Sequence, residues 1–329
     1  MIEEPATSLG ARPPARLRDY LAMARPDHWP KHVFILPGIV LAYLAHPAPP
    51  DRVLARCAVG LVAACLAASA NYVINEWLDA RSDRHHPSKS TRPAVVTEMS
   101  AALVAAEYLV LAGLALAAAA LVSPLYLYCS LAFLASGLTY NVRPLRTKDR
   151  AYLDVVTEAV NNPIRLTLGW AMVWPDTLPP SSLLLSYWMG GAFLMAIKRL
   201  AEHRLAAGAG VLDQLRLYRR SFRRYTDARL LISAFLYAQL AAFFLAVFLV
   251  KYRIEYLLSL PVFAALFAVY LRIGLKPDST AQRPEKLFRE RSLLAVVALL
   301  VATLALLTWI DIPALDRLSS PHYLRLGGE

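Results

Sequence analysis

Long apolar segments recur along almost the whole chain, and they constrain its fold more than any other feature. Nine such runs are separated by polar connections, at roughly 32–48, 53–76, 101–122, 124–140, 152–174, 182–199, 230–250, 254–272 and 293–311. As helices, these runs approach or reach the length needed to cross a hydrocarbon layer of about 30 Å. A helix also satisfies every backbone polar group internally, as a lipid environment requires. The sequence therefore predicts an all-α polytopic membrane protein with about nine transmembrane helices.

The predicted domain organisation is simple. We expect a polar N-terminal tail and surface helix over residues 1–24, a single membrane domain over 25–312 and a short polar C-terminal tail over 313–329. The three cysteines, Cys57, Cys65 and Cys129, all lie inside apolar runs and form no CxxC pair. They are expected to pack as small hydrophobic residues, so neither a disulfide framework nor a zinc site is predicted.

The positive charge of the chain is unevenly distributed. Lys and Arg number 35 against 24 Asp and Glu, for a net charge of +11, and most of the cations lie in alternate connections. The opposite connections, near residues 123, 175 and 251, are nearly free of Lys and Arg. By the positive-inside rule, the N-terminus and the basic connections face the cytoplasm. Because the charges flank membrane spans rather than a soluble domain, no nucleic-acid partner is expected.

A polar cluster follows the second apolar run. Asn75, Asp79 and Asp83 are spaced four residues apart, so on a helix they drift by only about 80° and share one sector. An amide oxygen and two carboxylates are oxygen ligands of the kind that Mg²⁺ prefers, together with phosphate oxygens and water. Lys89 and Arg92 follow closely and could neutralise the remaining phosphate charge. The segment therefore predicts a Mg²⁺-dependent diphosphate site at a membrane surface.

A second acidic cluster leads into the fifth run. Asp154 and Glu158 are one helical turn apart and mirror the first cluster, so the two faces together could hold Mg²⁺ and a diphosphate. Lys148 and Arg165 would add cationic contacts. Pro163 lies within the run and is expected to kink the helix.

Both clusters also have a structural explanation. Arg81 and Arg84 could pair with the acids of the first cluster in a solvated helix cap. In the second cluster, a Glu–Arg ion pair within the membrane could hold helices together.

A third group of polar residues surrounds the longest connection, at about 198–229. Lys198 and Glu202 are four residues apart and could simply pair with each other. The arginine-rich run 219–224 could contact anionic lipid headgroups or grip a phosphorylated substrate. Near the first span, Lys31 is placed to reach a phosphate.

These motifs together resemble the UbiA superfamily of intramembrane prenyltransferases, over almost the whole chain. Within it, the sequence is more similar to the decaprenyl-phosphate phosphoribosyltransferase branch. The details that carry this likeness are Arg25–Pro26, Trp29, Lys31, His86–Pro87–Ser88–Lys89, Arg92–Pro93, Lys198–Arg199, Ala201–Glu202, Tyr225–Thr226, Pro284–Glu285, Arg289 and Arg291. Glu76 departs from the pattern, because the family usually has Asp there, and the Ala94–Glu98 stretch lacks the usual Gly.

The resemblance implies helices around a central cavity that is open to the cytoplasm and the bilayer, in a bacterial inner membrane. It implies Mg²⁺-dependent transfer of 5-phosphoribose from phosphoribosyl diphosphate to a polyprenyl phosphate. The implied catalytic residues are Asp79, Asp83 and Asp154, and the implied metal ligands are Asn75, Asp79, Asp83, Asp154 and Glu158. The implied substrate contacts are Lys31, Lys89, Arg92, Lys148, Arg165, Lys198, Arg199, Glu202 and Tyr225.

Two other functions use the same residues. A prenyl diphosphate could donate its chain to an aromatic acceptor such as a quinone precursor, but the many additional cations favour a phosphoribose donor. A transporter of a phosphorylated solute is a weaker alternative, because the clusters lie at span ends rather than mid-membrane. Membrane lipids are expected partners, and the sequence leaves the oligomeric state open, a homo-oligomer included.

Overall fold

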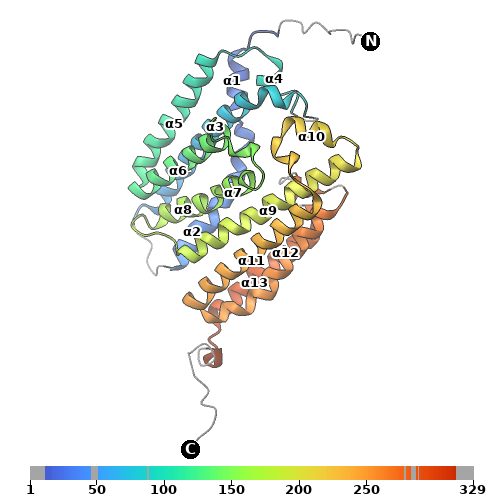
Figure 1. Ribbon diagram of the computed structural model, residues 1–329. Coiled ribbons are helices and arrows are strands. Elements are labelled where there is room, and N and C mark those ends of the chain that lie inside the picture. Colours follow the sequence, from blue (N-terminus) through green and yellow to red (C-terminus); the bar gives the residue numbers. More distant parts are fainter. Residues whose placement is uncertain are drawn as a thin grey trace, which may run out of the picture. The chain divides into compact units, whose positions relative to one another are not determined.

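The computed structural model describes residues 12–45, 51–86, 89–277, 279–282, 287 and 289–315, except for the side chains of residues 30 and 31. Within these ranges the chain is helical, and its only β pairing is an isolated bridge between Pro14 and Glu98 (Figure 1). The chain forms two compact units. The first contains Met1–Pro179 and Ala209–Tyr225, and the second contains Pro180–Gly208 and Thr226–Glu329.

The first unit is built mainly around one long helix, α3. Its elements are α1 (Leu17–Met23), η1 (Pro26–Ile35), α2 (Leu36–Ala45), α3 (Val53–Asp83), α4 (Pro93–Val96), α5 (Ala101–Val122), α6 (Pro124–Asn141), η2 (Thr147–Asp149), α7 (Leu153–Ala159), α8 (Asn161–Val173), α10 (Leu212–Tyr218) and η3 (Arg220–Arg223). The second unit contains α9 (Ser181–Gly208), α11 (Asp227–Tyr252), η4 (Ile254–Ser259), α12 (Leu260–Leu275), η5 (Thr280–Gln282) and α13 (Arg291–Trp309).

Within the described residues, each of the nine apolar runs falls mainly on helices, which confirms the all-α prediction. Five helical segments are both long and apolar enough to cross a membrane: α3, α5, α11, the continuous segment Ile254–Leu275 and α13. The first run forms a shorter apolar helix, His32–Ala45. The protein is therefore an integral membrane protein, although the described residues do not confirm a count of nine spans.

The predicted fifth run is divided into two helices. α7 ends at Ala159 and α8 begins at Asn161, so the chain turns at Val160 rather than continuing through 152–174. Pro163 is the third residue of α8, where the missing N–H of proline has no intrahelical partner to lose. The expected kink is thus a helix boundary, and it separates the acids of the second cluster from the buried part of α8.

Small residues let the helices of the first unit approach closely. α3 packs against α5, α6 and α8, and alanines such as Ala67 and Ala115 fill the interface between α3 and α5. α2 and α8 meet at two glycines. A Cβ atom at Gly38 would lie 2.0 Å from the Leu166 carbonyl oxygen, and one at Gly169 would lie 2.2 Å from the Ile35 carbonyl oxygen. This close packing fixes the helices that lead to the polar end of α3.

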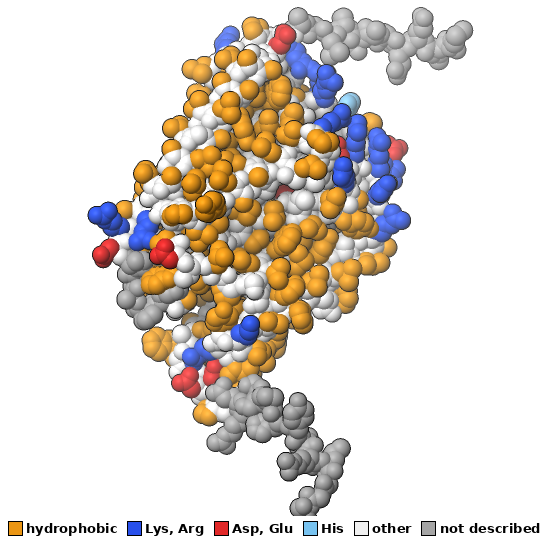
Figure 2. All heavy atoms as spheres, turned by 60° about the vertical axis from the view of Figure 1, so that its left-hand side comes forward, with side chains coloured by type: hydrophobic (Ala, Val, Ile, Leu, Met, Phe, Trp, Pro, Cys, Tyr) orange, Lys and Arg blue, Asp and Glu red, His pale blue; other side chains and the backbone are white. Residues whose placement is uncertain are grey.

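The outward surface is apolar along the spans. On α5, Leu109 is 66% exposed and Leu121 is 78% exposed, as expected for side chains that face lipid. Hydrophobic side chains cover much of the surface in Figure 2, whereas Lys and Arg gather toward the margins of that view. In the second unit, α9 packs along α11, and Phe193 of α9 contacts Phe267 of α12.

Candidate active site

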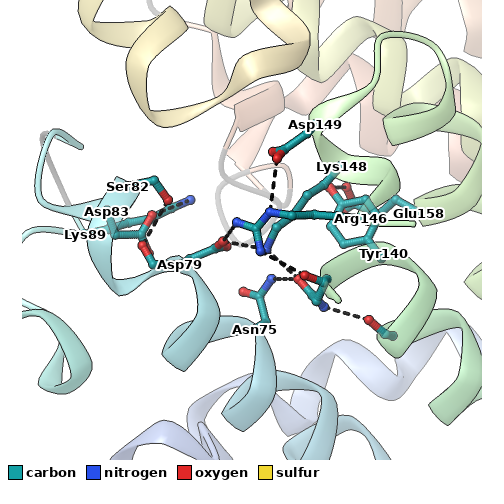
Figure 3. Close-up of polar contacts among 12 residues, drawn as sticks. Asn75, Asp79, Ser82, Asp83, Lys89, Tyr140, Arg146, Lys148, Asp149 and Glu158 are labelled. Carbon is teal, nitrogen blue, oxygen red and sulfur yellow. Dashed lines mark hydrogen bonds and ion pairs between the residues drawn. The ribbon is translucent and has the colours of Figure 1, made fainter. Parts of the chain in front are cut away.

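The first polar cluster occupies the last turns of α3. Because α3 continues without a break to Asp83, Asn75, Asp79 and Asp83 lie on successive turns of one helix. Asn75 and Asp79 are half-buried, and Asp83 is buried. Figure 3 shows Asp83 beside Lys89, in the connection that follows α3, and Asp79 beside Arg146 and Lys148, in the connection that follows α6.

Asp83 is held by the connection after α3. The guanidinium of Arg92 donates to Asp83 Oδ2 at 2.7 Å, and Lys89 Nζ lies 3.9 Å from Asp83 Oδ1. Arg92 Nε also lies 3.9 Å from Glu76 Oε2, about two helical turns before Asp83 on α3. Arg92 therefore bridges two buried carboxylates, an arrangement that fixes the connection against α3.

Asp79 is held by the connection after α6. Its Oδ1 atom lies 3.0 Å from Arg146 Nη2 and 2.5 Å from Lys148 Nζ (Figure 3). Arg146 also donates to Asp149 Oδ2 at 3.1 Å. Lys148 is almost fully buried, and this burial lowers its pKa to about 8, because removal from water disfavours the cation. Asp79 opposes that shift by attracting the ammonium group.

Asn141, the last residue of α6, links these groups. Its Oδ1 atom accepts hydrogen bonds from Asn75 Nδ2 at 2.5 Å and from Lys148 Nζ at 2.6 Å. Its own amide nitrogen donates to the Gly137 carbonyl at 2.9 Å, and its main-chain oxygen accepts from Arg146 at 2.8 Å. Since Asn75 uses its amide nitrogen here, its amide oxygen is left to face another partner.

Glu158 lies beside this network, on α7. Tyr140 donates its hydroxyl to Glu158 Oε2 at 2.8 Å, and the Lys148 ammonium lies 6.0 Å from the centre of the Tyr140 ring. Figure 3 shows Tyr140, Lys148 and Glu158 grouped on one side of the Asp79 contacts.

Asp154 takes part in a different set of contacts. It is fully buried and accepts hydrogen bonds from Tyr225 Oη at 2.5 Å and from Ser221 Oγ at 3.1 Å. The Tyr225 hydroxyl also accepts from the Tyr152 amide at 2.7 Å. Asp154 thus anchors the arginine-rich segment around η3 to α7, and Tyr225, an implied substrate contact, is engaged in that anchor.

The donor set of α3 fits Mg²⁺. Within the described ranges, no group of three or more His, Cys, Asp or Glu side chains is arranged to hold a metal ion. Mg²⁺ needs fewer protein ligands, because it keeps several waters and is commonly held by one or two carboxylates with substrate phosphates. Asp79, Asp83 and the amide oxygen of Asn75 meet that requirement. A metal-binding role for Asp154 or Glu158 remains a prediction.

The other implied substrate contacts belong to other elements. Arg165 of α8 stacks over the Phe133 ring at 5.3 Å. Lys198, Arg199 and Glu202 belong to α9 of the second unit, where the buried Arg199 lies 3.4 Å from Glu202. The side chain of Lys31 lies outside the described residues, as do Pro284–Glu285 and the outer parts of both predicted tails.

Sequence reasoning missed two residues of the site and left one alternative open. Arg146 and Asn141 were not expected to contact the first cluster, although Arg146 stands two residues before Lys148 and Asn141 directly follows an apolar run. The alternative was that Arg81 and Arg84 neutralise the acids of α3. In the part of the chain that the structure describes, neither arginine forms an ion pair, and Asp79 and Asp83 are paired with other cations.

Comparisons with known proteins relate the chain to one family. Residues 33–294 match the UbiA prenyltransferase family. The chain is 35% identical over 237 residues to the decaprenyl-phosphate phosphoribosyltransferase of Mycolicibacterium smegmatis, covering 68% of this chain and 70% of that protein. The enzyme of the same name from Mycobacterium tuberculosis is 32% identical over 223 residues, covering 65% of this chain and 70% of that protein.

Solved structures share the fold. A UbiA homologue from Archaeoglobus fulgidus bound to DMAPP and Mg²⁺ matches with a TM-score of 0.65 at 19% identity, covering 89% of this chain and 100% of that one. A digeranylgeranylglyceryl phosphate synthase matches with a TM-score of 0.57 at 12% identity, covering 88% of this chain and 95% of that one. The match over most of the chain, and the relatives above 30% identity, show that this membrane-embedded transferase belongs to the UbiA prenyltransferase family.

Proposed function

We propose that the protein transfers 5-phosphoribose from phosphoribosyl diphosphate to a polyprenyl phosphate, with Mg²⁺ as cofactor. The observation that carries the proposal is the pairing of Asp79 and Asp83, one turn apart on α3, with four cations: Lys89, Arg92, Arg146 and Lys148. A diphosphate with its metal ion needs both kinds of group, carboxylates for the metal and cations for the phosphate oxygens.

Donor binding is a partner exchange in this proposal. Without donor, Asp79 and Asp83 pair with the four cations and reduce the repulsion among them in a buried site. With donor, the two carboxylates and the Asn75 amide oxygen would hold the metal, which frees the cations to contact the diphosphate. Mg²⁺ when bound supplies charge stabilisation of the leaving diphosphate. Asn141 holds the side chains of Asn75 and Lys148 in position during the exchange, because it accepts a hydrogen bond from each.

The reaction itself needs little acid–base chemistry. An oxygen of the polyprenyl phosphate forms a bond to C1 of the ribose, and the bond from C1 to the diphosphate oxygen breaks with its electron pair on the diphosphate. The attacking phosphate is already ionised, so no strong general base is required. Lys89, Arg92, Arg146 and Lys148 stabilise the charge that accumulates on the leaving group.

Two observations favour a phosphoribosyl donor: the names of the relatives and the presence of a further cation beyond the four that contact Asp79 and Asp83. Both relatives above are named for a phosphoribosyltransferase activity on decaprenyl phosphate. A phosphoribosyl donor also carries a phosphate beyond its diphosphate, and Arg219 lies close enough to Lys148 to contribute to lowering its pKa. The uneven loop charges support a bacterial inner-membrane protein with these site loops in the cytoplasm.

The test compares two donor and acceptor pairs on the purified full chain with Mg²⁺. One tube contains phosphoribosyl diphosphate and a polyprenyl phosphate, and the other contains a prenyl diphosphate and 4-hydroxybenzoate. Mass spectrometry should show a phosphoribosylated lipid in the first tube, lost with EDTA and lost in Asp79→Asn and Asp83→Asn. Asp176→Asn changes an exposed acid outside the site and serves as the control. A prenylated aromatic in the second tube, with no lipid product in the first, would reject the proposed donor and acceptor.

A further inference from the structure

A cavity lies along α3 beside the candidate active site. It has a volume of about 530 Å³ and opens beside the last turns of α3 and the segment that follows α4. Its lining includes Arg12, Trp77, Leu78, Arg81, Arg84 and Met99. We call this cavity the α3 groove.

The α3 groove and the candidate active site use different faces of the same helix. At about 100° per residue, Trp77, Arg81 and Arg84 fall on roughly the opposite side of α3 from the sector of Asn75 and Asp83. None of the groove residues takes part in the contacts of Asp79 and Asp83. The groove is therefore a separate site, and its ligand need not be the donor diphosphate.

The charge of the groove is not neutralised by its own walls. Arg12, Arg81 and Arg84 form no ion pair with any residue that the structure describes. Glu98 is the only acid among the lining residues, against these three arginines. An anion would therefore find guanidinium groups that no described carboxylate engages, and guanidinium matches phosphate geometry particularly well.

The floor of the groove is apolar. Trp77, Leu78 and Met99 line it together with Ala80 and Ala94. The groove also lies at one end of a helix long and apolar enough to cross a membrane. A ligand that combines a phosphate with hydrocarbon fits such a lining, because tryptophan favours the boundary between headgroups and acyl chains.

We propose that the α3 groove binds the headgroup of an anionic phospholipid of the surrounding bilayer, independently of the transferase reaction. The arginines contact the lipid phosphate, and the apolar floor receives the beginning of an acyl chain. A bound lipid would stabilise the pairing of the N-terminal segment with the residues that follow α4, because this pairing forms one wall of the groove. Glu98 forms backbone hydrogen bonds with Pro13 at 2.9 Å and with Ala15 at 3.0 Å. Glu98 stands two residues after the end of α4, which begins directly after Arg92.

Lipid binding can be measured without measuring activity. The purified full chain, freed of lipid in detergent, is titrated with phosphatidylglycerol, phosphatidylcholine or inorganic phosphate, and bound lipid is counted by native mass spectrometry. Phosphatidylglycerol should bind selectively. Each arginine near a lipid surface contributes about fivefold in affinity, so Arg81→Gln/Arg84→Gln should weaken binding by about 25-fold. The matched control, Arg143→Gln/Arg150→Gln, removes two exposed arginines outside the groove and should bind as the wild type does.

A second readout uses Trp77. Phosphatidylglycerol with brominated acyl chains should quench part of the tryptophan fluorescence, and Trp77→Phe should remove that part. Equal retention of phosphatidylcholine and phosphatidylglycerol by the wild type would overturn the proposal. Unchanged binding by the Arg81→Gln/Arg84→Gln variant would do the same, and so would competition by inorganic phosphate alone.

Discussion

Replacing Asp79 with Asn probes the partner exchange at the site with almost no change in shape. The substitution removes the carboxylate that lies 3.0 Å from Arg146 and 2.5 Å from Lys148. Arg146 keeps Asp149 at 3.1 Å, and Lys148 keeps the Asn141 amide oxygen at 2.6 Å. The loss should therefore fall near the lower end of the cost of breaking a buried ion pair, about 3 kcal/mol. For a unit of this size that corresponds to a fall in Tm of roughly 6 to 12 °C.

The response of this variant to diphosphate separates the account from simple destabilisation. In Asp79→Asn, Arg146 and Lys148 lose the Asp79 carboxylate, although Arg146 keeps Asp149, so diphosphate alone can bind where that carboxylate was. At about a hundred times its Kd it should recover about 2.7 kcal/mol, nearly the whole loss. In the wild type, Asp79 repels diphosphate unless Mg²⁺ is present. Diphosphate should therefore raise the Tm of the wild type only with Mg²⁺, and that of Asp79→Asn without it.

The assay is thermal unfolding of both proteins in detergent, each with diphosphate, with Mg²⁺, with both and with neither. Asp176→Asn controls for the loss of one exposed negative charge and should behave as the wild type does. If diphosphate alone shifted the Tm of wild type and Asp79→Asn equally, Asp79 would not be shielding the cations, and the partner-exchange argument would be wrong.

Three further changes test other parts of the structure. Asn141→Leu removes the acceptor shared by Asn75 and Lys148, so turnover should fall at least tenfold by steady-state kinetics, and a smaller loss would contradict a positioning role. Gly38→Ala places a Cβ atom 2.0 Å from a carbonyl oxygen of α8 and should lower the free energy of unfolding by about 1–3 kcal/mol. The control Gly113→Ala has nothing within 4 Å of its Cβ position and should not destabilise the protein. Equal Tm values for these two variants would refute the packing argument. Tyr225→Phe removes a hydrogen bond to Asp154, so hydrogen exchange should rise in residues 209–225 but not in α3, and unchanged exchange would show that the anchor is unimportant.

Much of the fold was predictable because membrane helices are encoded locally. An apolar run both forms the helix and specifies its length, and α5 ends within the predicted 101–122. The break at Val160 was less predictable, since an apolar run with one proline does not reveal whether the helix bends or stops. α9 continues to Gly208, beyond the apolar run, because polar residues such as Glu202 and Arg204 are still good helix formers.

The candidate site was predictable only in part, for a similar reason. The spacing of Asn75, Asp79 and Asp83 is local and can be read from the sequence. The contact of Arg146 with Asp79 joins residues 67 positions apart, and it depends on how α3 and α6 pack. The bond between Tyr225 and Asp154 spans 71 positions, which no local pattern specifies. Such contacts follow from tertiary structure rather than from periodicity.

The most direct test of the proposed reaction follows the two halves of the donor separately. Phosphoribosyl diphosphate carrying one radiolabel in the ribose and another in the diphosphate is incubated with the protein, Mg²⁺ and a polyprenyl phosphate, and the lipid is then extracted. The account predicts that the ribose label enters the lipid phase while the diphosphate label stays in water, and that both events cease in Asp83→Asn. Ribose label that never reaches the lipid would contradict phosphoribosyl transfer by this protein.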